Sequence, residues 1–98
     1  MSAWVYIMAS RLNGTLYVGM TTDILQRIYD HKNDIKPGFT SKYGVKRLVW
    51  FETYDNVIDA IAQEKRMKHW WRSWKIQLIE KTNPDWDDLY GLLVNGDL

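Results

Sequence analysis

The sequence contains no cysteine. Disulfide bonds and thiolate metal sites are therefore excluded, and an intracellular, cytoplasmic location is expected. Its apolar runs are too short to span a bilayer, and its first residues show no basic segment followed by an apolar stretch. We therefore expect neither membrane association nor a signal peptide. The net charge is only +1, so charge alone does not indicate an anionic partner.

The residues that are present are typical of a small globular protein. The chain has 98 residues, of which 46% are hydrophobic. That length and composition predict one folded domain and argue against intrinsic disorder. We expect residues 1–83 to form its main body and residues 84–98 to form a C-terminal extension of the same domain.

A β-hairpin is predicted at the start of the chain. Trp4–Ala9 is rich in β-branched and aromatic residues, Asn13-Gly14 is a turn signal, and Thr15–Gly19 is the expected partner strand. Side chains alternate between the two faces of a strand. Tyr6 and Tyr17 are therefore able to share one face of the hairpin.

A helix is predicted after the hairpin. Asp23 and Gln26 have the spacing of a capping box, and the helix is expected to run to about Asn33. Ile24 and Ile28 would form its apolar stripe.

The rest of the chain predicts one more strand and two more long helices. We expect a loop over Lys36–Gly44, a strand over Arg47–Tyr54, a helix capped by Asn56 and ending near Trp71, and another capped by Ser73 and ending before Asn83-Pro84. One further helical turn is expected near Leu89, followed by a frayed end. This order predicts an α+β domain with a small, three-stranded, mainly antiparallel sheet flanked by helices.

Glu64 interrupts the apolar stripe of the helix that follows Asn56. A carboxylate directed at a core is costly unless it is paired or bound to a metal ion. One interpretation is an ion pair with Lys68, four residues further on. The other is a ligand for Mg²⁺ or Mn²⁺, which prefer oxygen ligands. The apolar residues around Glu64 on the helical projection are Val57, Ala60, Ile61, Met67 and Trp71.

The other polar candidates also have two interpretations. Arg27 and His31 lie four residues apart, and they are either ordinary surface and structural residues or a cation beside a titratable base. Tyr6 and Tyr17 are ordinary strand residues by propensity. The tryptophans after position 69 favour packing over base stacking; they are Trp70, Trp71, Trp74 and Trp86.

A cluster of basic residues precedes an acidic C-terminal stretch. This distribution predicts either a face that binds phosphates or a solvated helix face. The basic residues are Lys65, Arg66, Lys68, Arg72 and Lys75, and the acidic ones are Asp85, Asp87, Asp88 and Asp97.

Several of these residues together resemble a known family. Val5-Tyr6-Ile7 and Tyr17-Val18-Gly19 resemble the paired signature of the GIY-YIG nuclease superfamily, and Thr22–Ile28 with His31 resembles its first helix. Glu64 occurs where the family has its metal-binding glutamate. The resemblance covers residues 3–81. The sequence is similar to small stand-alone bacterial members, many described only as uncharacterised, and to the nuclease modules of a DNA-repair excinuclease and of some homing endonucleases.

Two positions depart from the family pattern, and a third feature of the pattern has only a candidate residue. Val5 replaces the leading glycine of the first motif, and Met20 stands where some members have a lysine. Asn83 is a candidate for the late asparagine that many members place beside the active site. These departures bear on catalysis more than on the fold.

The resemblance implies an endonuclease that hydrolyses nucleic-acid phosphodiester bonds with one divalent metal ion, Mg²⁺ or Mn²⁺. In that mechanism Glu64 holds the metal, Arg27 binds a phosphate oxygen, and Tyr17 orients or deprotonates the attacking water with Tyr6 beside it. His31 competes with Tyr17 as the base. The basic residues 65–75 would bind the nucleic-acid backbone.

Three functional hypotheses remain open at this stage. The first is an active nuclease, for which DNA is the expected nucleic acid while RNA and the structure of the substrate, duplex, flap or junction, stay open. The second is a nucleic-acid-binding module of the same fold with weak or no catalysis, and the third is a protein-interaction domain that uses the aromatic C-terminal residues. A protein partner is also possible for an active nuclease, because a single module has no separate targeting domain.

Overall fold

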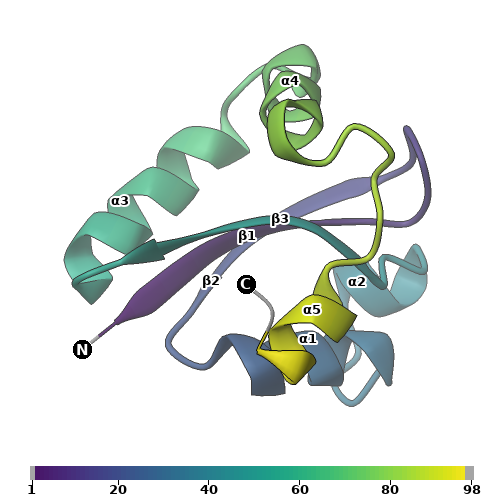
Figure 1. Ribbon diagram of the computed structural model, residues 1–98, viewed down its shortest axis with the longest axis horizontal. Helices are drawn as coiled ribbons and strands as arrows, with labels where there is room; N and C mark the ends of the chain where they lie inside the picture. Colours follow the sequence, from purple (N-terminus) through teal and green to yellow (C-terminus); the bar gives the residue numbers. More distant parts are fainter. Residues whose placement is uncertain (1, 97–98) are drawn as a thin grey trace.

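A three-stranded antiparallel sheet forms the centre of the molecule. The computed structural model describes residues 2–96, and its strands are β1 (Ala3–Ala9), β2 (Leu16–Thr21) and β3 (Arg47–Tyr54). The strand order is β2-β1-β3 (Figure 1). The central strand β1 is buried at almost every position, as expected for a strand paired on both sides. The predicted α+β class is confirmed.

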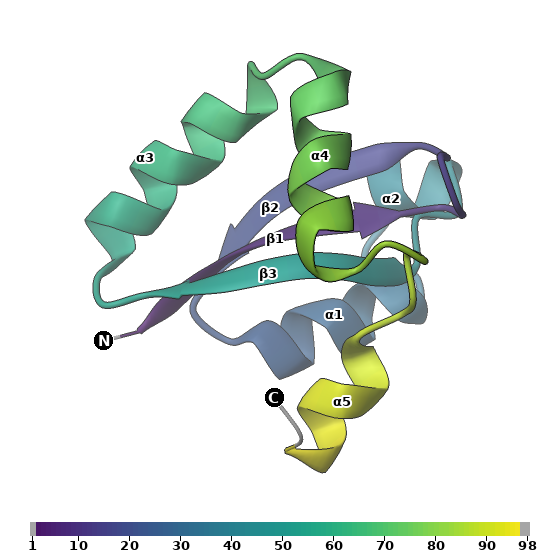
Figure 2. The same ribbon diagram turned by 45° about the horizontal axis from the view of Figure 1, so that its top comes forward.

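Helices cover both faces of this sheet. Helices α3 (Val57–Lys68) and α4 (Arg72–Thr82) lie on one face, and α1 (Ile24–Lys32) and α5 (Tyr90–Asn95) lie on the other (Figures 1 and 2). Alternation along β1 therefore supplies two cores. The core under α3 and α4 contains Val5, Ile7, Ala60, Met67 and Ile79, and the core under α1 contains Tyr6, Met8, Ile24, Ile28 and Leu48.

The predicted helix starts are confirmed in their main contacts. The Asp23 carboxylate accepts a hydrogen bond from the Gln26 backbone N–H at 3.2 Å, and Asn56 Oδ1 accepts one from the Asp59 N–H at 2.8 Å. The side chain of Gln26 donates to Asp30 instead of returning to residue 23. Only one half of the predicted capping box is therefore formed.

The predicted loop over residues 36–44 contains a short helix, α2 (Phe39–Lys42). Thr40 is the buried residue of this helix, and its carbonyl accepts a hydrogen bond from the Val45 N–H at 2.8 Å. Propensity gave no signal for a single turn between two glycines. One buried threonine and tertiary contacts hold it in place.

Two boundaries near Trp71 were predicted wrongly. Helix α3 ends at Lys68, where the N–H groups of His69 and Trp70 bond to carbonyls three residues back and tighten the last turn. Trp71 is extended, 73% exposed, and serves as the N-cap residue of α4 without a side-chain hydrogen bond. It is not part of the apolar stripe of α3, and Ser73 is inside α4 instead of capping it.

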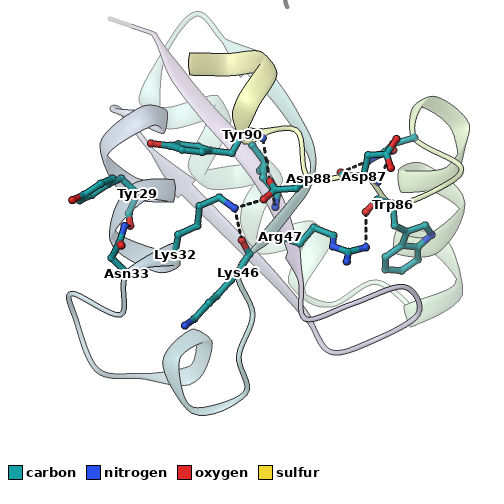
Figure 3. A network of polar contacts seen from close by, with 11 residues as sticks. Tyr29, Lys32, Asn33, Lys46, Arg47, Trp86, Asp87, Asp88 and Tyr90 are labelled. Atoms are coloured by element: carbon teal, nitrogen blue, oxygen red, sulfur yellow. Dashed lines mark hydrogen bonds and ion pairs between the residues drawn. The ribbon is translucent and has the colours of Figure 1, made fainter. Parts of the chain in front are cut away.

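The segment after α4 is held against β3 and α1 by polar contacts (Figure 3). Asp88 accepts hydrogen bonds from the backbone N–H groups of Leu48 and Tyr90 and forms an ion pair with Lys32. Arg47 donates to the Trp86 carbonyl at 3.0 Å. The predicted turn near Leu89 is α5, while residues 97–98 of the expected frayed end lie outside the described residues.

None of the helices within residues 2–96 is both long and apolar enough to cross a membrane.

Candidate active site

Tyr6, Tyr17 and His31 meet near the β2 edge of the sheet, on the face that α1 covers. The Tyr6 hydroxyl and His31 Nε2 are 2.9 Å apart, within hydrogen-bond distance. The His31 ring centre lies 5.8 Å from that of Tyr6 and 5.5 Å from that of Tyr17, and the two tyrosine rings are 6.3 Å apart. Two residues of the hairpin and one of the first helix therefore form a single cluster.

Gly19 makes room for this cluster. It pairs with Tyr6 across the two strands, and the Tyr6 ring lies directly over it. A Cβ atom at position 19 would be 2.4 Å from the Tyr6 hydroxyl oxygen and 2.9 Å from the Tyr17 ring. The glycine of the second motif is thus explained by a close approach of side chains, because its backbone is ordinary extended strand.

Burial shifts the pKa values of Tyr6 and His31 in opposite directions. Burial raises the pKa of Tyr6, and the nearby Tyr17 raises it further, while the Arg27 charge lowers it. Burial lowers the pKa of His31 below its usual 6.5, and the Arg27 charge lowers it further. A protonated phenol and a neutral imidazole are therefore favoured at neutral pH.

Thr40 is a site residue that sequence reasoning missed. Its hydroxyl lies 2.9 Å from His31 Nδ1, so both ring nitrogens of His31 have partners. Thr40 is buried on α2 and fixes the orientation of the ring. No motif could have identified it, since its role depends on how the segment after α1 folds back.

Arg27 lines a cleft that opens beside this cluster. The cleft has a volume of about 190 Å³, and Tyr17, Arg27 and His31 contribute to its wall. Tyr6 is fully buried behind the wall. The cleft therefore presents a guanidinium, a phenol and an imidazole to one small space.

Glu64 reaches the same cluster from α3. Its side chain is 20% exposed, and Lys68 lies 3.5 Å from its carboxylate, so the predicted ion pair is present. The Lys68 ammonium is also 6.0 Å from the centre of the Tyr17 ring, and the charge of Glu64 contributes to raising the pKa of Tyr6. Glu64 is thus largely buried at the border of the core, linked to Tyr17 through Lys68 and near enough for its charge to act on Tyr6. It does not line the cleft itself.

Comparison with known proteins identifies the family. The family model described as the GIY-YIG catalytic domain matches residues 2–77. The chain belongs to the GIY-YIG family. It is 34% identical over 76 residues to a UPF0213 protein of Clostridium perfringens, covering 78% of this chain and 81% of that one. It is 32% identical over 78 residues to a UPF0213 protein of Haloquadratum walsbyi, covering 80% and 86%.

A solved structure is similar to this GIY-YIG chain over most of its length. The solution NMR structure of a UPF0213 protein from Bacillus halodurans matches with a TM-score of 0.56 and 30% identity. The match covers 90% of this chain and 93% of that one. The family resemblance and the fold predicted from the sequence are both confirmed.

The GIY-YIG site offers separate carboxylates to a metal ion: Glu64 from α3 and Asp30 in the cleft wall, which accepts a hydrogen bond from Gln26. No group of three or more His, Asp or Glu side chains within residues 2–96 is placed to hold one. Glu64 is a hard oxygen donor beside the cluster, and Mg²⁺ accepts one or two carboxylates when water and substrate phosphate complete its shell. The residues present therefore fit a divalent ion that binds mainly together with its substrate.

The basic residues after Glu64 have mixed environments. Lys65 and Arg66 are exposed, and Arg66 donates to Gln63 on its own helix. The Arg72 guanidinium donates to the carbonyls of Asn13 and Gly14 at 2.8 and 2.6 Å and thereby ties α4 to the hairpin loop. Burial and the charge of Arg72 lower the pKa of Lys75. Lys65 and Arg66 are thus more available to a phosphate backbone than Arg72.

Two other sequence expectations need correction. Asn83 is buried and bonded to the Val49 carbonyl on β3, the edge strand opposite β2, so it lies apart from the cleft at the β2 edge. The packing role predicted for the late tryptophans holds for Trp86, which is fully buried. Trp71 and Trp74 are 73% and 51% exposed, because the chain turns outward between α3 and α4.

Proposed function

We propose that this GIY-YIG chain is an endonuclease that hydrolyses phosphodiester bonds of nucleic acid, of DNA in preference to RNA. One observation carries the proposal. Arg27, Tyr17 and His31 face one cleft, and the Glu64 carboxylate is near enough for its charge to act on Tyr6. Family membership supports the same reaction class.

Arg27 is the group we assign to the scissile phosphate. It lines the cleft and has no ion-pair partner among residues 2–96, so its charge is available to a ligand. The planar guanidinium fork matches two phosphate oxygens. It would also stabilise the negative charge that grows on the phosphate during attack.

The two tyrosines have different roles in this proposal. Tyr17 borders the cleft and is placed to orient the attacking water, whereas Tyr6 is buried and remains protonated because its pKa is raised. Tyr6 and Thr40 hold His31 from its two ring nitrogens. His31 is neutral at pH 7 because its pKa is lowered. Both of its ring nitrogens are engaged, so it would take the water proton after releasing the Tyr6 or the Thr40 hydroxyl from one of them.

Glu64 is the residue we assign to a divalent cation, Mg²⁺ or Mn²⁺. A bound cation of this kind neutralises charge on the phosphate and eases departure of the leaving oxygen. Lys68 forms an ion pair with the Glu64 carboxylate, so the carboxylate would have to bind the cation and Lys68 together. Exposed Lys65 and Arg66 would attract the backbone on either side, with affinity that falls as salt rises.

The second candidate function is a nucleic-acid-binding module with weak or no catalysis. Met20 stands where some family members have a lysine, and the Glu64–Lys68 ion pair occupies the proposed metal ligand. Binding without turnover would follow if that ion pair persists in the presence of Mg²⁺.

Cleavage by matched carboxylate variants tests these candidates. Plasmid, branched DNA, single-stranded DNA and RNA are incubated with the wild type, Glu64→Gln and Glu52→Gln in Mg²⁺ or Mn²⁺. Glu52 is an exposed carboxylate on β3, so its variant controls for the loss of one charge. We expect Glu64→Gln to lose at least about 100-fold in rate and Glu52→Gln to match the wild type.

Two results would contradict the proposed chemistry. Equal cleavage by the wild type and Glu64→Gln would remove Glu64 from the mechanism. Salt-sensitive binding of the same substrates with no product in either metal would replace the nuclease by the binding module.

A further inference from the structure

Two exposed aromatic side chains stand at α2. Phe39 and Tyr43 are 47% and 48% exposed, and their ring centres are 4.7 Å apart. About half of each residue is exposed to water, and neighbouring exposed apolar residues often mark a binding surface. We refer to these two residues as the Phe39–Tyr43 pair.

The Phe39–Tyr43 pair continues the wall of the cleft outward. Phe39 lines the cleft, and its ring centre lies 6.0 Å from that of Tyr17 at an interplanar angle of 30°. The three rings therefore follow one another from the proposed reaction centre to the surface. A ligand that extends from the phosphate position would meet Phe39 first.

The backbone around the pair is anchored. Thr40, between the two rings in sequence, is buried and lies 2.9 Å from His31 through its hydroxyl. Val45, just after Tyr43, is fully buried. A ligand that stacks on these rings would therefore lose little affinity to ordering of the segment.

The charge around the pair favours an anionic chain. Residues 35–46 contain three lysines and no acidic residue, while Lys46 is paired with Asp34 and the cleft wall also contains Asp30. Lys36 lines the cleft next to Phe39, and the Lys42 ammonium lies 5.4 Å from the centre of the Tyr43 ring. Proteins bind single-stranded nucleic acid with aromatic rings interleaved with cations. The bases stack on the rings, and the phosphates contact the cations.

We propose that the Phe39–Tyr43 pair is a stacking site for an unpaired nucleobase adjacent to the scissile phosphate. This inference rests on the proposed nuclease function and adds a substrate class to it. Bases inside a duplex have both faces covered by their neighbours, so only a strand with an unpaired nucleotide can reach the pair. The preferred substrates are thus single strands, flaps or bulged duplexes.

Fluorescence of a base analogue tests stacking without any cleavage. A single-stranded DNA oligonucleotide with one central 2-aminopurine is titrated with the Glu64→Gln protein in EDTA, alone and annealed to its full complement. We expect emission to fall on binding the single strand and to change little with the duplex. Adding Phe39→Leu or Tyr43→Leu should weaken single-strand binding about tenfold and restore much of the emission.

Tyr29→Leu is the matched control for these variants. Tyr29 is an aromatic residue of α1 with 49% exposure that does not line the cleft. We expect it to leave both affinity and emission unchanged. Thermal melting of each variant by circular dichroism separates loss of stacking from loss of folding.

The outcomes keep the stacking site and the nuclease activity apart. Equal quenching by the Phe39→Leu, Tyr43→Leu double variant and the parent overturns the stacking site even if the wild type cleaves DNA. Equal affinity for single strand and duplex overturns it as well. Quenching that depends on both rings supports the site even if no cleavage is found.

Discussion

The two edges of the sheet both collect polar residues from several elements, but they use them differently. At the β3 edge, Arg47, Asn83 and Asp88 each have protein partners, as Figure 3 shows for Arg47 and Asp88. At the β2 edge, Arg27 has no ion-pair partner within residues 2–96 and faces a cleft. Arg47 is satisfied by the fold, whereas Arg27 is available to a ligand.

This difference separates structural polar groups from functional ones. A polar cluster that is completed internally stabilises the fold and leaves nothing for a substrate. A cluster with an unpaired guanidinium, a neutral imidazole and a largely buried carboxylate can still bind an anion, a proton or a cation. The edges therefore predict opposite consequences for similar substitutions.

The largest expected effect comes from the two arginines. Arg27→Ala should reduce kcat/KM for cleavage by about 100- to 1000-fold, because one preorganised donor to the phosphate is lost, with little change in melting temperature. Arg47→Ala should keep activity and lose about 1 kcal/mol of unfolding free energy through its bond to the Trp86 carbonyl. Cleavage kinetics and urea unfolding of both proteins check this.

The comparison fails if Arg47→Ala lowers kcat/KM as much as Arg27→Ala does in folded protein.

Asn83 provides the next largest effect, and it is one of stability. The register between β1 and β3 shifts between Ile7 and Met8, so Val49 has no partner on β1. Asn83 donates to the Val49 carbonyl and to the Asp87 carbonyl and accepts from the Asp87 N–H. Asn83→Ala should lower the unfolding free energy by about 2–3 kcal/mol, measured by urea denaturation.

Activity at a temperature well below the melting point should be unchanged in Asn83→Ala. A specific loss of kcat there would return Asn83 to the catalytic site that the family pattern suggested.

Local patterns in the sequence predicted the parts of the molecule that depend on near neighbours. The bounds of β3, the Asn56 cap and the shared face of Tyr6 and Tyr17 follow from propensity, capping chemistry and the two-residue repeat of a strand. Glu64 stood out because it interrupted an apolar stripe. All of these signals lie within about a dozen residues of one another along the chain.

What the sequence could not predict depends on contacts between distant segments. Thr40 acts through His31, Asn83 acts on a register shift in β3, and Trp71 is exposed because two helices meet at a turn. Each has an ordinary residue type for its position. Only the folded arrangement distinguishes a buried threonine beside an imidazole from a loop threonine.

Gly19 at the β2 edge can be compared with Gly91 in α5. Gly19→Ala would place Cβ 2.4 Å from the Tyr6 hydroxyl oxygen, so the Tyr6 ring must move away from His31. We expect about 1–3 kcal/mol of lost stability from overpacking. Cleavage should also fall. Gly91→Ala meets nothing within 4 Å and should stabilise by up to about 1 kcal/mol.

Thermal melts and cleavage rates of the two alanine variants check this pair. Wild-type activity in Gly19→Ala would show that the contact between Tyr6 and His31 is not needed for catalysis.

The smallest effect concerns pH and follows from His31. Its pKa in the folded protein lies below the usual 6.5 because burial and Arg27 disfavour the charged ring. As pH falls through 6.5, the unfolded chain takes up a proton at His31 that the folded protein resists, so the unfolding free energy decreases. Above 6.5 both states hold a neutral ring, and this contribution becomes constant.

A double difference isolates this contribution from the carboxylates. Urea unfolding of the wild type and of His31→Gln is measured from pH 5 to pH 8, and the difference in unfolding free energy is plotted against pH. We expect this difference to rise with pH up to about 6.5 and then level off. The control His69→Gln retains His31, so its unfolding free energy should vary with pH as that of the wild type does. A difference that rises on acidification would mean that the folded protein favours the charged imidazole. His31 would then be a cation beside Arg27 at neutral pH, and it could not accept the proton of the attacking water.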